Sequence, residues 1–122
     1  VSSAGGRAVL RVIDDENMQD NCKVLGDHIL RRMRAMQDKY DVVGDVRGAG
    51  LMLGMELVKC RDSKEPATAE TSQAFEELRD LGVLMGKGGL YGNVFRIKPP
   101  MCWSMEDADY MCDALDIALA KL

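Results

Sequence analysis

The chain has 122 residues, a length typical of one domain. It carries 20 acidic residues against 16 Lys and Arg, a formal net charge of −4, which disfavours a nucleic-acid partner because such surfaces need an excess of positive charge. No apolar run approaches the ~20 residues that cross a bilayer, so we expect no membrane partner. The single histidine and four cysteines, none in a C-x-x-C pair, predict free thiols and no metal site.

Two helices are predicted within the first 40 residues. The first carries apolar residues between 9 and 13, and either Ser2 or Ser3 is expected to cap it. The second has one apolar face, because its apolar residues recur at steps of three and four. These residues are Met18, Cys22, Leu25, Ile29, Met33 and Met36. Gly26 lies in this helix at a cost of about 1 kcal/mol against alanine, so we expect another backbone to approach it closely.

The pattern becomes β-rich after residue 41. Residues 42–47 and 51–58 are predicted to be paired strands joined by a turn at 48–50, and positions 51, 53, 55 and 57 form the apolar face of the second strand. A charged loop over 59–67 is expected next. A third helix is predicted to begin at Thr68 or Thr71 and to end at Gly82, where a left-handed residue is favoured.

The last third of the sequence predicts two strands and a helix. We expect a short strand over 83–85, a glycine-rich loop over 86–93 and a strand over 94–98 that Pro99 ends. Ser104 and Asp107 have the spacing of a capping box at the start of the last helix. The order α-α-β-β-α-β-β-α indicates an α+β fold, a small and mostly antiparallel sheet covered by helices.

Few residues indicate chemistry. The glycine clusters match neither a phosphate loop nor a dinucleotide fingerprint, and positive-φ turns explain most of them. No nucleophile, base or metal-ligand arrangement emerges, so no catalytic residue is assigned. Arg96 is the candidate site residue: in mid-strand, with Phe95 and Ile97 on the opposite face, its planar fork of donors suits a carboxylate. A solvated arginine, or one paired with an internal acid, remains the alternative.

Two separated segments resemble class-III pyridoxal-phosphate aminotransferases. Residues 42–57, VVGDVRGAGLMLGMEL, are similar to one motif of that family, and residues 82–89 followed by FRIKPP at 95–100 are similar to its late strand pair. The resemblance extends over the whole chain and is strongest to the mitochondrial branch that acts on alanine and glyoxylate.

The resemblance implies a carboxy-terminal part of a longer chain. Residues 41–122 would be the small domain of a fold-type I aminotransferase, and residues 1–40 a helical segment leading into it. By motif, Arg96 would bind the carboxylate of an amino acid or keto acid substrate. The Schiff-base lysine and the other residues that bind pyridoxal phosphate would lie upstream, so this chain alone is expected to be inactive. A homodimer and a mitochondrial location are also implied. The residues themselves leave open a free-standing module that binds a small anion, or a dimerising domain.

Overall fold

The structure is a computed structural model that describes all residues from 1 to 122. It has four helices and five strands. They are α1 (Ser2–Asp15), α2 (Met18–Lys39), β1 (Val43–Ala49), β2 (Met52–Cys60), β3 (Glu65–Pro66), α3 (Thr68–Asp80), β4 (Gly86–Gly88), β5 (Val94–Ile97) and α4 (Met105–Ala120). The predicted α+β order is confirmed, with the two-residue β3 as an addition inside the segment expected to be a loop.

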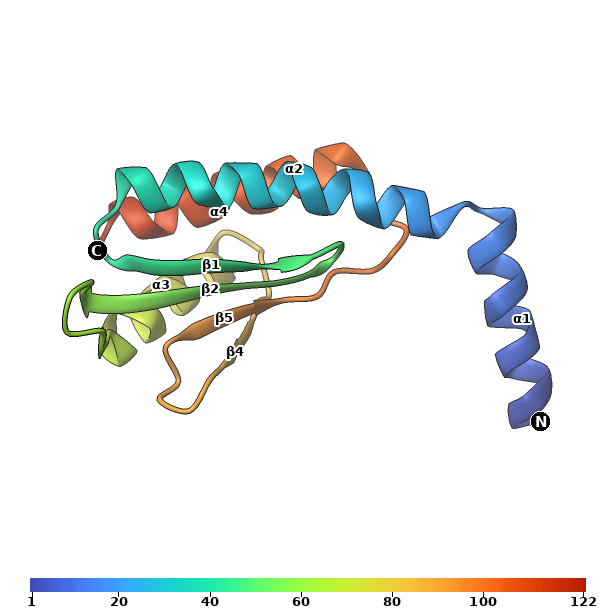
Figure 1. The fold of residues 1–122 in the computed structure, drawn as a ribbon, viewed down its shortest axis with the longest axis horizontal. Coiled ribbons are helices and arrows are strands. Elements are labelled where there is room, and N and C mark those ends of the chain that lie inside the picture. The colour runs from blue at the N-terminus through green and yellow to red at the C-terminus, as the bar shows by residue number, and fades with distance from the viewer.

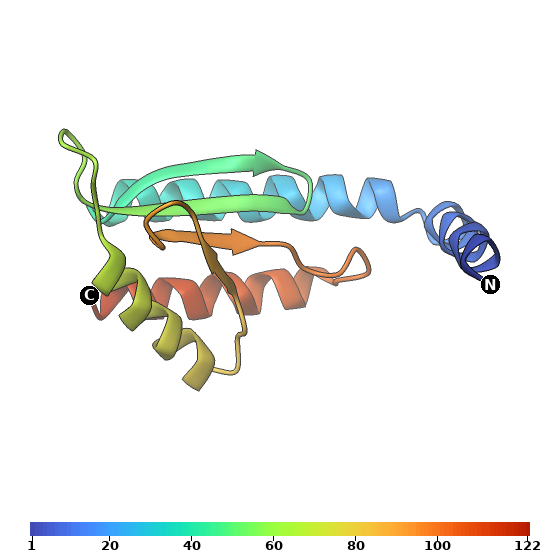
Figure 2. The same ribbon diagram turned by 90° about the horizontal axis from the view of Figure 1, so that it is seen from below.

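The sheet is antiparallel, and its strands lie in the order β1-β2-β5-β4, with β3 paired to the far end of β2. Helices α2 and α4 lie side by side over one face (Figure 1), and the view from below shows the strands in front of both helices (Figure 2). The opposite face of the sheet is therefore left open by these two helices. No helix of the chain combines the length and the apolar character needed to cross a membrane.

The core lies between the sheet and the helices. The predicted apolar face of α2 is confirmed from Leu25 onward, because Leu25, Ile29 and Met33 are almost fully buried. The first two residues of that face, Met18 and Cys22, are half-buried. Met55 and Leu57 of β2 meet the buried residues of α2 from the sheet, as the alternation predicted. Burial of large apolar side chains contributes about 1.5–3 kcal/mol each, so this layer is the main source of stability.

Gly26 confirms the expected close approach. A Cβ atom at this position would lie only 2.2 Å from the carbonyl oxygen of Gly50, in the turn between β1 and β2. Gly50 itself has φ +53°, a left-handed conformation that favours glycine. The missing side chain at Gly26 therefore lets the turn between β1 and β2 lie against the middle of α2.

Helix α1 differs from the other helices because none of its residues is buried. It projects away from the rest of the molecule (Figure 1). The predicted caps Ser2 and Ser3 are wrong: Val1 occupies the N-cap position and no side chain caps the helix. Because the helix begins one residue earlier than expected, both serines lie inside its first turn.

The strand predicted over 83–85 is also wrong. A hydrogen bond from the Val83 amide to the Leu78 carbonyl ties this segment to the end of α3, after Gly82 has turned the chain with φ +80°. The strand that pairs with β5 is instead β4, Gly86–Gly88, inside the segment predicted to be a loop. The capping box at Ser104 and Asp107 is confirmed, with both reciprocal hydrogen bonds present.

Candidate functional site

Arg96 lies on the open face of the sheet. Its neighbours in β5, Phe95 and Ile97, are buried in the core, and alternation along the strand turns Arg96 to the opposite side, where its side chain is exposed. The predicted orientation is confirmed. β5 has strand partners on both sides, β2 and β4, so the backbone that carries Arg96 is held in two ladders.

Both cross-strand neighbours of Arg96 are glycines. Gly54 of β2 and Gly86 of β4 are its register partners. Directly opposed residues in an antiparallel sheet have Cβ atoms about 4.5–5.5 Å apart, so a larger side chain at either position would lie against Arg96. A Cβ at Gly86 would be 2.9 Å from the Arg96 carbonyl oxygen and 3.7 Å from its Nε, whereas at Gly54 the nearest atom would be 3.8 Å away. Neither cross-strand neighbour therefore carries a side chain that would cover Arg96.

The sequence does not identify the two glycines as neighbours of Arg96, because their relation to it depends on strand register. Gly54 lies at an outward-facing position of an alternating strand, and this position is the sequence signal that could have identified it. Gly86 lies in the segment that the sequence predicts to be a loop.

Two clefts meet at this arginine. One, of about 410 Å³, lies between the segment after α3 and the start of α4 and includes Trp103 and Met111 in its wall. The other, of about 470 Å³, extends over the open sheet face and includes Arg47. Arg96 and Lys98 line both clefts. A ligand in either cleft would therefore meet these two cations.

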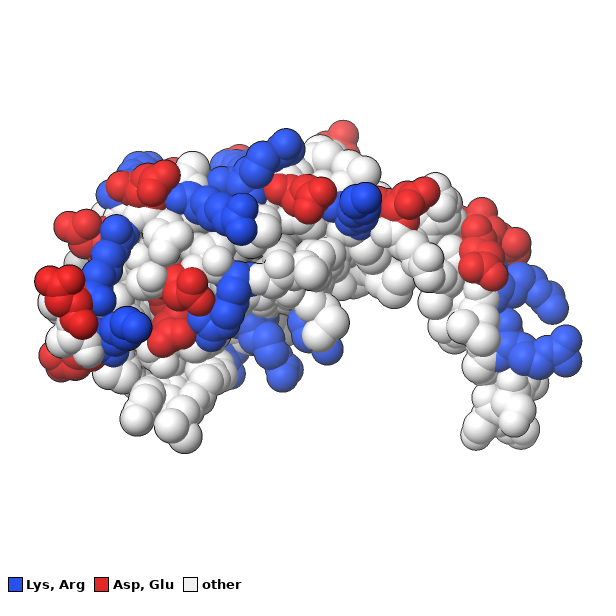
Figure 3. Space-filling view, in the orientation of Figure 1, with Lys and Arg blue, Asp and Glu red and all other residues white.

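Arg96 forms no ion pair and no side-chain hydrogen bond within the chain. Arg47, on β1, is the contrasting case: its Nη1 lies 2.5 Å from Asp45 Oδ2 and 2.9 Å from Glu56 Oε2. The hydrogen bond to Asp45, followed by that to Glu56, raises the pKa of the Arg47 guanidinium. Lys and Arg side chains project below the strands, on the side away from α2 (Figure 3). Arg96 is thus a free fork of donors, and a carboxylate could accept two parallel hydrogen bonds from it.

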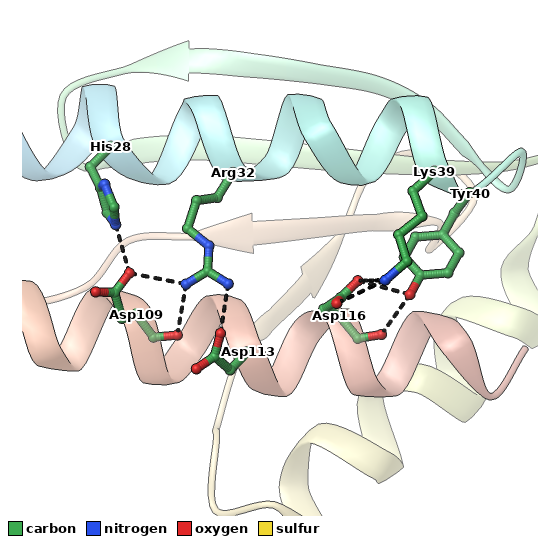
Figure 4. A network of polar contacts seen from close by, with 7 residues as sticks. All are labelled: His28, Arg32, Lys39, Tyr40, Asp109, Asp113 and Asp116. Atoms are coloured by element: carbon green, nitrogen blue, oxygen red, sulfur yellow. Dashed lines mark hydrogen bonds and ion pairs between the residues drawn. The ribbon is translucent and has the colours of Figure 1, made fainter.

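The main polar network of the chain lies elsewhere, along the parallel helices α2 and α4 (Figure 4). Asp109 Oδ1 lies 2.6 Å from His28 Nε2 and 3.0 Å from Arg32 Nη1. The hydrogen bond from His28, and then that from Arg32, lowers the pKa of Asp109. Further along, Asp116 accepts from Lys39 and Tyr40. The single histidine is therefore engaged in helix packing and not in the clefts around Arg96.

The sequence and the fold have counterparts among known proteins. Residues 1–119 match the aminotransferase class-III family, so the chain belongs to that family. The mitochondrial alanine–glyoxylate aminotransferase 2 homolog 2 of Arabidopsis thaliana is 47% identical over 122 residues, 100% of this chain and 26% of that protein. The chain thus spans about a quarter of the length of the curated relatives it matches.

Solved structures show the same fold. An Arthrobacter phospholyase in complex with phosphoethanolamine has a TM-score of 0.93 and 36% identity, covering 99% of this chain and 29% of that one. An amine transaminase from an uncultivated Pseudomonas species, in a form with bound pyridoxal phosphate, has a TM-score of 0.83 and 32% identity, covering 93% of this chain and 26% of that one. The predicted resemblance and the fold-type I architecture are confirmed.

The family implies pyridoxal phosphate, so we asked whether residues of this chain fit it. A lysine that forms a Schiff base at neutral pH needs a lowered pKa, which burial or a neighbouring cation provides. Every lysine of this chain is exposed: Lys23, Lys39, Lys59, Lys64, Lys87, Lys98 and Lys121. Lys87 donates instead to Ser72 Oγ at 3.0 Å and lies over the Phe75 ring. No lysine here fits covalent attachment of the cofactor, and we assign it no residue of the chain.

Proposed function

We propose that this chain is the carboxy-terminal part of a pyridoxal-phosphate-dependent aminotransferase that transfers an amino group from alanine, or a related amino acid, to glyoxylate. In this proposal residues 41–122 form the small domain, and residues 1–40 form the helical segment that leads into it. The observation that carries the proposal is Arg96, an unpaired guanidinium between two glycines where two clefts meet.

The role of Arg96 in this reaction is to bind and orient. A bidentate pair fixes both the position and the plane of a substrate carboxylate, so it also restricts the direction of the amino group or the carbonyl. Amino donor and keto acceptor both carry this carboxylate, and the same anchor serves both halves of the reaction. The bond-making groups are proposed to lie in the part of the protein outside this chain.

The Arabidopsis relative supports this substrate pair, and its name supports a mitochondrial location for the protein. We also propose that the full-length protein is a homodimer, as the family resemblance implies. Membership of an enzyme family favours this function over a free-standing anion-binding module.

The Arthrobacter neighbour favours a second candidate, cleavage of an amino compound that carries a phosphate group. Arg96 with Lys98 could hold a phosphate as well as a carboxylate, because both are anions with several acceptor oxygens. The higher identity of the Arabidopsis relative supports the aminotransferase as the first candidate.

The test uses the full-length protein with its cofactor. Incubation with alanine and glyoxylate is expected to yield pyruvate and glycine, and incubation with phosphoethanolamine to release no phosphate. Arg96→Leu is expected to lower kcat/KM for both alanine and glyoxylate by about 10–100-fold, since hydrogen bonds between charged groups contribute about 1.5–3 kcal/mol. Arg34→Leu, an exposed arginine of α2 outside the clefts, is the matched control. Unchanged kinetics in Arg96→Leu would remove Arg96 from the site, and phosphate release would favour the second candidate.

A further inference from the structure

We propose that Lys98 is a second cation of the carboxylate site, which draws anionic substrates onto Arg96 and adds affinity without forming the oriented pair. The inference rests on the proposed function, in which Arg96 binds the substrate carboxylate.

Geometry places the two cations together. Lys98 follows Ile97, the last residue of β5, and so lies two positions from Arg96. Residues two apart on extended backbone share a face and are about 7 Å apart. Pro99 comes next, and a residue before proline is confined to extended conformations, so the backbone keeps this alternation beyond the end of the strand. Lys98 is exposed, and it lines both clefts together with Arg96.

No acidic group neutralises Lys98. It forms no ion pair within the chain, whereas the nearby Arg47 is held between two carboxylates. Asp107 lies in the wall of the first cleft, but its Oδ2 accepts from the amide and the hydroxyl of Ser104 in the capping box. The hydrogen bond from the Ser104 amide, and then that from its hydroxyl, lowers the pKa of Asp107, so this carboxylate stays ionised and engaged at the helix end.

The two unpaired cations stand out against a chain with a net charge of −4. Together they form a local positive region on this acidic chain, an arrangement that raises the local concentration of anions and speeds their association. The two side chains differ in how they bind an anion. The planar guanidinium sets orientation, whereas the ammonium is a flexible point charge that attracts an anion from several directions.

The expected size of the effect follows from Coulomb attraction. A unit charge about 7 Å from a carboxylate changes binding about threefold in water and more where solvent is excluded, so we expect a loss of about three- to tenfold. The interaction is screened by salt, since the Debye length is about 10 Å at 0.1 M ionic strength. A purely structural role for Lys98 would show no such salt dependence.

The experiment compares variants of the full-length holoenzyme with alanine and glyoxylate at low and high sodium chloride. Lys98→Gln is expected to lower kcat/KM for glyoxylate about three- to tenfold at low salt, mainly through KM, and the difference from the parent protein is expected to shrink at high salt. Lys98→Arg is expected to retain the low-salt value. Lys23→Gln removes one exposed charge from α2, outside both clefts, and is expected to have no effect.

The outcomes separate this inference from the function on which it rests. If Arg96→Leu impairs the reaction while Lys98→Gln matches Lys23→Gln at every salt concentration, the role of Lys98 is refuted and the anchor stands. If Arg96→Leu is silent, the anchor itself is refuted. A loss in Lys98→Gln that does not change with salt, or that Lys98→Arg fails to restore, would also overturn the proposal.

Discussion

Replacing Gly86 by alanine tests whether the proposed binding role of Arg96 depends on the space that the glycine leaves beside it. The new methyl group would lie 2.9 Å from the Arg96 carbonyl oxygen and 3.7 Å from its Nε. Gly86 does not have a positive φ, so alanine is compatible with the backbone at this position and the conflict comes from its neighbour alone. We expect β4 and β5 to separate locally and the guanidinium to move with its strand.

The magnitude follows from these contacts. Ordinary van der Waals contact begins near 3.4 Å, so the methyl and the carbonyl must separate by about 0.5 Å. Overpacking of this kind costs about 1–3 kcal/mol of stability. A misplacement of about 1 Å can lower a rate about 100-fold, so half that displacement is expected to lower kcat/KM by about tenfold for every substrate that carries a carboxylate.

Gly88 provides the matched control in the same strand. A Cβ at Gly88 would meet nothing within 4 Å, so Gly88→Ala should leave both stability and kinetics close to those of the parent protein. Steady-state kinetics of the full-length enzyme with alanine and glyoxylate would be measured for both variants. Equal kinetic constants for Gly86→Ala and Gly88→Ala would refute the reasoning, because only the first places a group against Arg96.

Three further predictions concern stability and reactivity. Gly26→Ala should weaken the hydrogen-exchange protection of α2, because its methyl group would meet Gly50 and overpacking of this kind costs about 1–3 kcal/mol. Gly6→Ala, in the exposed helix α1, should cause no loss of protection. Protection of Gly26→Ala equal to that of the parent protein would contradict this prediction. Thiol labelling at neutral pH should reach Cys60 first, because backbone hydrogen bonds from the following turn lower the pKa of this thiol. Cys112 should be labelled only on unfolding, because burial raises its pKa to about 11. Early labelling of Cys112 would contradict the packing of α4. Folding lowers the pKa of Asp109, so the stability that this carboxylate adds is complete above its unfolded pKa of about 3.9 and is lost as the pH falls through the lowered value. Between about pH 5 and 3, the urea midpoint of Asp109→Asn should therefore fall less steeply than that of the parent protein. Parallel curves for the two proteins would argue against the contact between Asp109 and α2.

Periodicity predicted most of the fold because its apolar residues decide both element type and orientation. The spacing of Leu25, Ile29 and Met33 fixed which face of α2 is buried, and the alternation around Met55 fixed the orientation of β2. Gly26 indicated a close contact, because a glycine in mid-helix lowers helix stability and packing must offset that loss. Its partner, Gly50, could not be named from spacing alone.

The predictions were wrong where strand pairing outweighs the local β-propensity of the residues. Val83 has strong β-propensity, yet its amide bonds to the end of α3 and it lies outside the sheet. Residues 86–88, two of them glycines with low β-propensity, pair with β5 instead. The same limit applies to the site. The alternation predicted the exposure of Arg96, but its two glycine neighbours follow from strand register, a long-range property that no local window contains.

The double hydrogen-bonded support of β5 has a thermodynamic consequence for recognition. An anchor on a mobile loop would lose backbone freedom on capturing its ligand, at about 1–2 kcal/mol for each residue that becomes ordered. With ladders on either flank, that ordering has already occurred during folding, and only the dihedral angles of one long side chain remain to be fixed. In the proposed function, pairing of β5 with the short edge strand β4 thus favours affinity, because it removes an entropic cost that substrate binding would otherwise have to offset.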